Sequence, residues 1–272
     1  VSTCGLATTH TLVGGAPMPM HRPLPRRLLG VWAHPDDEAY LSAGLMARVI
    51  DAGGAVTVVT ATRGEHGTAD PALAGTAGFA RTRQSELEAS LGELGVTDVR
   101  FLGIPDGECD RVCTESVVAE LERTIADVSP DAIVTFGPDG ITGHPDHRAV
   151  SRWTTAAWQR SGRLAELLYA AMTTSFLDRY ADLHARLGVF AEYGARPASI
   201  PTWSVALGCS LTDAELIRKR AALAQHASQT GPLAEAVGEA TYLRWWRDET
   251  FRAPNSSESR ADPCEELVGA TP

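Results

Sequence analysis

The chain has 272 residues, of which 44% are hydrophobic, and its formal net charge is −10. This length and apolar content suffice for one large α/β domain with a proper core, which excludes a chain that is disordered as a whole. The acidic balance argues against nucleic acids and anionic membrane surfaces as main partners. Since no apolar run approaches the length of a membrane span, we expect no membrane partner.

The N-terminal segment and the cysteines bear on processing and compartment. Residues 1–25 are rich in Thr, Gly and Pro and have no basic region before an apolar core, so we expect a disordered leader rather than a signal peptide. The five cysteines are odd in number and scattered, which indicates a reducing cytoplasm and no disulfide framework. Cys109 and Cys113 lack a second thiol pair that would complete a zinc site, and we interpret them as ordinary residues.

Strands and helices alternate over the first 150 residues. The apolar run 28–33 predicts a buried strand, and the periodic apolar residues of 38–52 predict the helix after it. The alternation continues with strands at 55–61, 99–102 and 132–136 and with helices at 78–94 and 115–128. This order predicts a mostly parallel sheet with helices on both faces.

Beyond residue 150 the pattern is weaker. We expect a helix over 147–160, a strand over 167–174, and an amphipathic helix over 211–229 with Thr212 as its N-cap. The predicted organisation is one domain over 26–251, including a smaller C-terminal appendage of helices and strands. A loose polar tail over 252–272 follows it.

The segment Ala33-His34-Pro35-Asp36-Asp37-Glu38 places a histidine and three carboxylates directly after the first strand. Adjacent carboxylates repel and raise each other's pKa, and a bound cation or a cationic partner relieves that cost. Taken alone, the segment is explained equally well as a helix N-terminus whose carboxylates cap free N–H groups.

A second segment, Gly143-His144-Pro145-Asp146-His147, follows the strand at 132–136. One His and one carboxylate from the first segment, with a His from the second, would form a set suited to Zn²⁺ with a fourth position open for water. The three-residue spacing within each segment directs both candidate ligands to one helix face. Two such segments, each after a parallel strand, are harder to explain as two independent caps, so we favour a metal site.

The polar clusters all fall where predicted strands end, at 33–38, 62–67, 103–108 and 139–147. Ligands bind at this edge of a parallel sheet, so we expect one pocket; the absence of G-x-G-x-x-G argues against a dinucleotide. Within these loops Asp106 is a candidate acceptor for sugar hydroxyls, and Arg63 and Glu65 are candidate substrate contacts. For each of the three, a structural salt bridge or turn cap is an equally good explanation. We interpret His226 as a core histidine.

The two His-Pro-Asp segments resemble those of the LmbE-like (PIG-L) family of zinc-dependent N-deacetylases. Weaker agreements occur at 62–65, at Arg83 and Glu86, and in the late helix, and the likeness spans about residues 28–251. It implies a Rossmann-like α/β fold and removal of the acetyl group from the amino sugar of a small glycoconjugate.

The resemblance also implies roles for five residues of the two segments. His34, Asp37 and His147 would hold the zinc, Asp36 would be the general base, and His144 would polarise the acyl oxygen. Chemistry supports these roles, because amide hydrolysis needs an activated water, a proton for the amine and, if His144 is protonated, a stabilised oxyanion. The ligand set also suits Fe²⁺, Co²⁺ or Ni²⁺.

The substrate is less well defined. Thr142 stands where some sugar-inositol deacetylases of the family have a Tyr, and the chain is short for that branch, so we favour a tailoring deacetylase of a glycosylated natural product, such as a glycopeptide antibiotic pseudoaglycone. The alternatives are a mycothiol-pathway GlcNAc-inositol deacetylase or conjugate amidase, and a carbohydrate-binding protein without activity. The presence of both Asp36 and His144 argues against the last.

Overall fold

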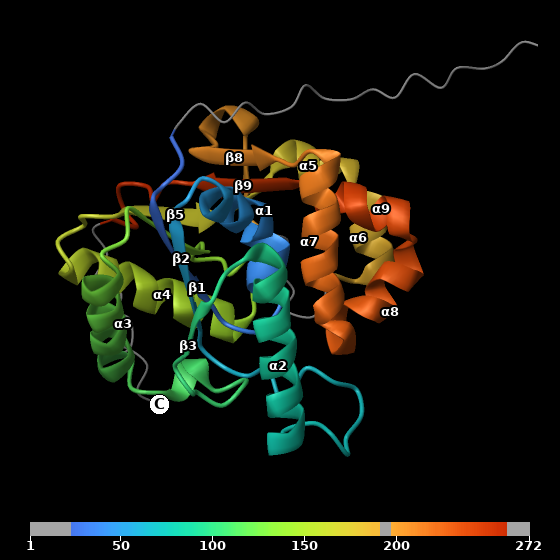
Figure 1. Cartoon of the computed structure of the whole chain (residues 1–272), viewed down its shortest axis with the longest axis horizontal. Helices are drawn as coiled ribbons and strands as arrows, with labels where there is room; N and C mark the ends of the chain where they lie inside the picture. Colours follow the sequence, from blue (N-terminus) through green and yellow to red (C-terminus); the bar gives the residue numbers. More distant parts are fainter. Residues whose placement is uncertain (1–22, 191–196, 260–272) are drawn as a thin grey trace, which may run out of the picture.

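The computed structural model describes residues 23–190 and 197–259, which include a seven-stranded sheet. Helices flank this sheet (Figure 1). The sheet order is β3-β2-β1-β4-β5-β9-β8. Its strands are β1 Arg27–Trp32, β2 Ala55–Thr60, β3 Asp98–Phe101, β4 Ala132–Phe136, β5 Glu166–Ala170, β8 Leu207–Ser210 and β9 Asp248–Arg252. The first five strands pair in parallel, and β9 runs antiparallel to both β5 and β8. The predicted mostly parallel α/β sheet is confirmed.

Helices cover both faces of the sheet. Helices α1, α2 and α7 pack against one another on one side, and α3 and α4 pack together on the other (Figure 1). The helices are α1 Asp37–Asp51, α2 Ala77–Leu94, α3 Thr114–Val128, α4 Pro145–Arg160, α5 Thr174–Arg179, α6 Ala181–Leu187, α7 Asp213–Gln225, α8 Ala227–Val237 and α9 Glu239–Trp245. Two 3₁₀ turns, Cys109–Arg111 and Thr202–Ser204, and a small parallel sheet of β6 Met172–Thr173 and β7 Ser199–Ile200 complete the described elements.

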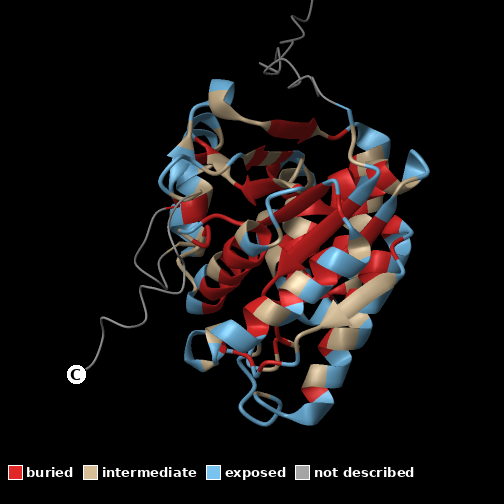
Figure 2. Cartoon of the chain, turned by 90° about the vertical axis from the view of Figure 1, so that its left-hand side faces the viewer, coloured by how far each residue is buried: buried red, intermediate tan, exposed pale blue. Residues whose placement is uncertain are grey.

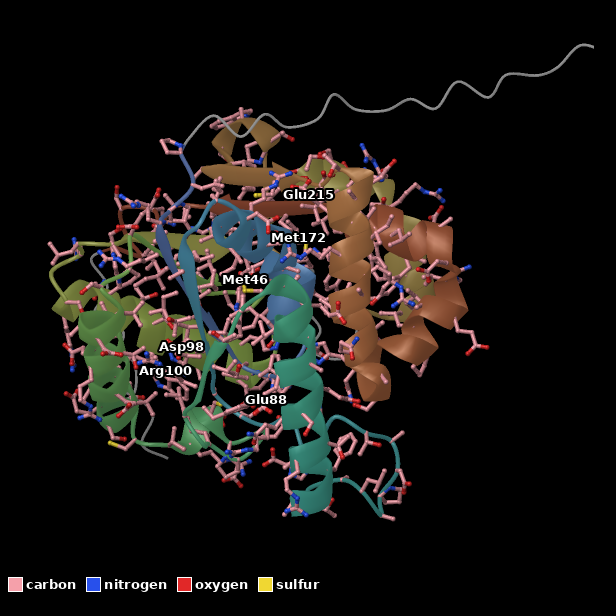
Figure 3. All side chains as sticks on the ribbon, in the orientation of Figure 1. Met46, Glu88, Asp98, Arg100, Met172 and Glu215 are labelled. Atoms are coloured by element: carbon pink, nitrogen blue, oxygen red, sulfur yellow. The ribbon has the colours of Figure 1, made fainter. Side chains whose placement is uncertain are left out.

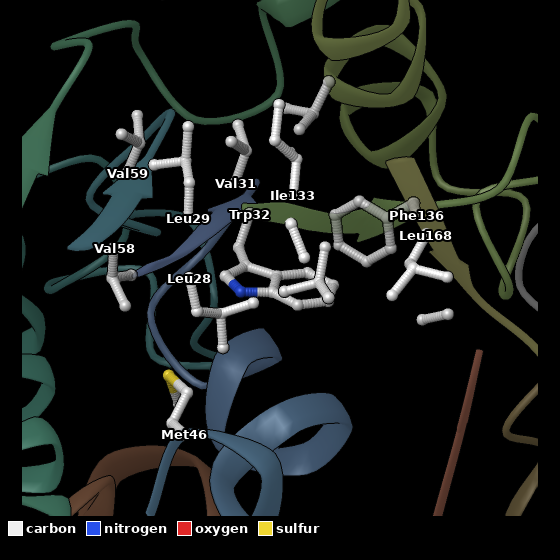
Figure 4. Close-up of a cluster of buried hydrophobic side chains, with 14 of the residues drawn as sticks. Leu28, Leu29, Val31, Trp32, Met46, Val58, Val59, Ile133, Phe136 and Leu168 are labelled. Atoms are coloured by element: carbon white, nitrogen blue, oxygen red, sulfur yellow. The ribbon is translucent and has the colours of Figure 1, made fainter. Parts of the chain in front are cut away.

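The central strands are buried on both faces, whereas the edge strand β3 is only partly covered (Figure 2). On β3 the polar residues Asp98 and Arg100 pair at 2.9 Å (Figure 3). In the core, the Trp32 and Phe136 rings meet edge to face with centroids 5.1 Å apart (Figure 4). Continuous apolar runs are expected for strands covered on both faces, because neither face meets water.

The predicted helix at 211–229 is wrong in one respect, because the structure divides it into α7 and α8 at His226. His226 has a non-helical ψ of 53°, and its ring lies against Glu38. The N-cap at Thr212 is confirmed, with a capping box to Glu215. The strand expected at 167–174 is likewise two strands, β5 and β6, and the last residue of that range begins α5.

Strand β9 lies inside the sheet, between β5 and β8, although it comes from the end of the predicted domain. Beyond it, Glu258 forms an ion pair with Arg252 at 2.7 Å. Most of the predicted leader, 1–22, and residues 260–272 of the predicted tail lie outside the described part of the chain.

Candidate metal centre and active site

The sheet order places the two His-Pro-Asp segments side by side. Strand β1 pairs with β2 on one side and with β4 on the other, so the chain order reverses between β1 and β4. Loops at such a switch point diverge and leave a crevice at the carboxyl ends of the strands, where α/β proteins bind ligands. The first segment follows β1 and begins α1, and the second begins α4.

Three predicted ligands converge there. The His34 Nδ1 atom lies 3.2 Å from His147 Nε2 and 3.6 Å from an Asp37 oxygen. His147 Nε2 lies 3.5 Å from the other Asp37 oxygen. A tetrahedral metal with bonds of about 2.0–2.2 Å holds its ligand atoms about 3.3–3.6 Å apart. The two histidine nitrogens face different oxygens of Asp37, and these separations are compatible with a metal ion held between the three residues, each of which is at most 9% exposed.

In His34 and His147, the ring nitrogen that faces away from the ligand cluster contacts other protein atoms. His147 Nδ1 lies 3.0 Å from the carbonyl oxygen of Gly140. His34 Nε2 lies 3.1 Å from Asp106 and 3.2 Å from Asp146. Metal-binding histidines characteristically donate the second N–H to a carboxylate or carbonyl, which fixes the tautomer and aims the other nitrogen at the metal. This pattern supports the same ligand set independently of the distances between its atoms.

Asp146 was not among the predicted site residues. It is fully buried and accepts backbone N–H groups from Gly107 and Cys109 as well as contacting His34. Its position within the second His-Pro-Asp segment was the sequence feature that could have identified it as a site residue. Asp106, predicted as a substrate contact or a turn cap, accepts the backbone N–H of His66 and also touches His34. Those contacts are structural ones.

Burial and neighbouring charges prepare the ligand set for a cation. Burial lowers the pKa of His147 to about 4, and nearby His34 and His144 add to the effect although Asp37 opposes it. Burial also opposes ionisation of Asp37, but the His147 and His34 rings outweigh it and hold the pKa below its usual range. Burial lowers the pKa of His34, yet Asp106, Asp146 and Asp37 together raise it well above its ordinary value. A metal ion that binds His34 would therefore compete with a proton.

Asp36, the predicted base, adopts a positive φ of 112°. A non-glycine residue in such a region costs about 1–3 kcal/mol and persists only where its surroundings hold it there. Its carboxylate lies 3.1 Å from Arg83 Nη2, and the same guanidinium donates to the carbonyl of Pro35. Burial raises the pKa of Asp36 to about 6, a change that Arg83 opposes and Asp37 reinforces. Strain and a raised pKa together are common at functional positions.

His144 is the N-cap residue of α4 and stacks on His147, with ring centroids 5.0 Å apart. Its Nδ1 atom accepts the backbone N–H of Asp146 at 3.1 Å. Burial and the charge of His34 lower the pKa of His144. A neutral ring whose Nδ1 accepts carries its hydrogen on Nε2. The structure thus favours a neutral donor over the protonated ring on which the role inferred from the sequence was conditional.

Arg63 and Glu65 lie beside the centre and outside the ligand set. The Arg63 guanidinium stacks over Phe101 at 4.9 Å and donates to Gln84. Glu65 accepts the backbone N–H of Asp106 at 3.1 Å. Both residues line a cavity of about 270 Å³. The other lining residues are Gly75, Thr76, Ala77, Ala80, Gly103, Ile104 and Pro105.

The fold and this site define an α/β protein with a cluster of His and Asp side chains that could hold a metal ion at the switch point of its sheet. The PIG-L family, described as GlcNAc-PI de-N-acetylase, matches residues 29–158. The "1D-myo-inositol 2-acetamido-2-deoxy-alpha-D-glucopyranoside deacetylase" of Actinosynnema mirum is 33% identical over 242 residues, covering 80% of this chain and 86% of that protein. The chain belongs to the PIG-L family.

A protein of the same name from Kineococcus radiotolerans is 37% identical over 161 residues, covering 49% of this chain and 45% of its own length. The chain spans about half the length of the curated relatives that match it in this way. The zinc-inhibited form of teicoplanin deacetylase Orf2 is similar in fold, with a TM-score of 0.59 and 16% identity over 85% of this chain and all of that one. Among the described helices, none is long and apolar enough to cross a membrane.

Proposed function

We propose that this protein is a metal-dependent hydrolase that removes the N-acetyl group from the N-acetylglucosamine moiety of a small glycoconjugate. The observation that carries the proposal is the three-ligand cluster of His34, Asp37 and His147 beside the strained Asp36. Membership of the PIG-L family and the names of the relatives support the same chemistry.

His34, Asp37 and His147 would hold the metal, and zinc is the first candidate because two imidazoles and a carboxylate suit it. Fe²⁺, Co²⁺ and Ni²⁺ prefer similar ligands and are to be tested beside it. When bound by these residues, a divalent metal would supply Lewis-acid polarisation of the acyl carbonyl and would lower the pKa of water.

Asp36 accepts the proton of the attacking water and returns it to the leaving amine. Its raised pKa of about 6 brings it close to the value that suits a general base near neutral pH. His144 donates its Nε2 hydrogen to the oxyanion that develops on the acyl group, so the ring is needed in its neutral form. Asp106 and Asp146 contact His34 Nε2 and so fix the orientation of its ring.

The conjugate that we propose to test first is N-acetylglucosamine joined to inositol. The relatives carry this compound in their names, and one of them aligns over most of this chain. The comparisons thus favour the inositol-linked alternative over the antibiotic pseudoaglycone preferred from the sequence, for which likeness to the teicoplanin deacetylase shows the fold alone. Arg63 and Glu65, at the neighbouring cavity, are proposed contacts for the non-reacting part of the conjugate.

The test is an acetyl-release assay by mass spectrometry on the inositol conjugate and on a pseudoaglycone bearing N-acetylglucosamine. Metal-stripped protein is reloaded separately with Zn²⁺, Fe²⁺, Co²⁺ and Ni²⁺, and unloaded protein is the control. We expect metal-dependent release from the inositol conjugate. Stoichiometric metal binding without acetyl loss from either compound would overturn the hydrolase proposal in favour of a carbohydrate-binding protein.

A further inference from the structure

We propose that the buried pair Glu38–His226 is a positioning device that holds the backbone of Asp36 in its strained conformation and so aims the base at the substrate. The inference rests on the proposed function, because it assigns Asp36 a catalytic task. It goes further by giving a role to two residues that touch neither the metal ligands' donor atoms nor the cavity beside them.

The two oxygens of the Glu38 carboxylate have different partners. One accepts the backbone N–H of Asp36 at 3.0 Å, and the other lies 3.0 Å from His226 Nε2. Both side chains are fully buried. The carboxylate therefore connects the residue with positive φ directly to the junction of α7 and α8, from which His226 comes.

Within residues 23–190 and 197–259, the His226 ring has one hydrogen-bonding side-chain partner, which is Glu38. Its Nδ1 atom is buried and has no hydrogen-bond partner there. Such a ring carries its hydrogen on Nε2 and donates it to the carboxylate. This bond fixes the rotation of the Glu38 carboxylate and leaves its second oxygen aimed at the Asp36 N–H.

Arg83 holds the same turn from the opposite side. It donates to the Pro35 carbonyl and to the Asp36 carboxylate, while its other terminal nitrogen donates to the Gly64 carbonyl at 2.8 Å. Arg83 thus binds the side chain of Asp36 and the carbonyl of the Pro35–Asp36 peptide, and Glu38 binds the N–H of that same peptide. With both polar groups of this peptide bonded, the strained conformation of Asp36 is held by more than one contact.

The test compares Glu38→Ala, Glu38→Gln and His226→Ala with the wild-type protein, all loaded with metal. Glutamine retains an oxygen that can accept the Asp36 N–H, so Glu38→Gln should keep most of the kcat that Glu38→Ala loses. We expect Glu38→Ala to lower kcat on the order of 10²-fold, the scale of a misplaced general base, with KM and bound metal nearly unchanged. The kcat of His226→Ala should lie between those of Glu38→Ala and Glu38→Gln.

Lys219→Met is the matched control, since Lys219 and Glu249 form an equally buried pair between α7 and β9. It destabilises the same helix packing without touching Asp36. Assays are made below the unfolding temperature of every variant. Equal losses of kcat in Lys219→Met and Glu38→Ala, or a normal kcat in Glu38→Ala, would overturn the positioning role.

A second measurement separates this inference from the proposed function. Hydrogen exchange at the Asp36 amide should be slow in the wild-type protein and in Lys219→Met, and fast in Glu38→Ala. If the wild-type protein deacetylates nothing, the proposed function fails, and the exchange rates still decide whether Glu38 holds Asp36. If it is active and the Asp36 amide exchanges equally in wild type and Glu38→Ala, only the positioning role fails.

Discussion

At the scale of single residues, Asp36 and the metal ligands have separate proposed roles: Asp36 is the base, and the ligands hold the metal. Asp36→Asn should keep the metal, because the Asp36 carboxylate pairs with Arg83 and no donor atom of the ligand cluster. Its turnover should fall about 10²–10⁴-fold, the usual contribution of a general base. His147→Ala should instead lose the metal itself. Elemental analysis after gel filtration, made beside the kinetics, distinguishes the two outcomes; loss of metal in Asp36→Asn would contradict the assignment.

Proton competition makes metal binding depend on pH. Neighbouring carboxylates raise the pKa of His34 well above its ordinary value, although burial opposes them, so a proton occupies the site at low pH. The apparent metal affinity should therefore increase as the pH rises towards that pKa, and fall when the solution is made acidic. Competition titration with a chelating dye from acid to neutral pH measures it. Asp106→Asn, which removes one of the carboxylates on His34, should shift the whole dependence to lower pH; an affinity independent of pH would contradict the mechanism.

Most of the candidate site was predictable because its residues stand together in short segments. His34, Asp36 and Asp37 share one turn, and the second segment follows a recognisable strand. The partners of these residues were not predictable. Glu38 and His226 are 188 positions apart, and His34 and Asp146 are 112 apart. Contacts at such separations depend on how helices are placed in space, which local patterns do not determine.

At the scale of elements, the start of α7 is fixed by more than its capping box. Arg48 of α1 forms a two-pronged ion pair with Glu215, with contacts of 2.6 and 2.9 Å. The bond to Arg48 lowers the pKa of Glu215 to about 2, and Thr212 contributes in the same direction. This carboxylate (labelled in Figure 3) therefore couples two helices on one face of the sheet.

Glu215→Gln should lower the free energy of unfolding at neutral pH by on the order of 1 kcal/mol, because the pair is only partly buried. A depressed carboxyl pKa stabilises the folded state above the unfolded-state pKa, and the contribution disappears as the pH falls towards about 2. The difference between wild type and variant should thus shrink below about pH 4. Urea unfolding across this range measures it. Glu235→Gln, at an exposed position of α8, is the control and should show little change at any pH.

Element boundaries were predicted well where local signals coincide with packing. The end of α2 at Gly95, with φ 79°, and the Thr212 cap of α7 are examples. The break at His226 escaped prediction because the sequence 211–229 is compatible with one helix. The bond from His226 to Glu38 and the bonds of Thr230 to the carbonyls of Leu223 and His226 accompany the interruption. Tertiary contacts override helix propensity at this position.

At the scale of the whole molecule, the alternation of strands and helices sufficed for the parallel part of the sheet, β1 to β5. It did not predict that β9 would insert between β5 and β8. An antiparallel strand needs no crossover helix, so no helix pattern in the sequence predicts its place in the sheet. The strand sequence DETFR is also short and polar for a buried position. The contacts of Glu249 on β9 explain its place. Its carboxylate accepts the backbone N–H groups of Gly44 and Leu45 and pairs with Lys219.

The Lys219–Glu249 pair therefore joins the C-terminal part of the chain to α1, and its removal should weaken the molecule as a whole. Lys219 Nζ lies 2.8 Å from Glu249 and 2.7 Å from the carbonyl oxygen of Tyr40, and both charged side chains are fully buried. Lys219→Met leaves a carboxylate in an apolar interior, which costs on the order of 3–5 kcal/mol. Urea unfolding should show a lower midpoint in one cooperative transition, with unchanged metal content in the folded protein. A separate early transition of the C-terminal helices would contradict this role, because it would show that β9 and α7 unfold independently of the sheet that carries the site.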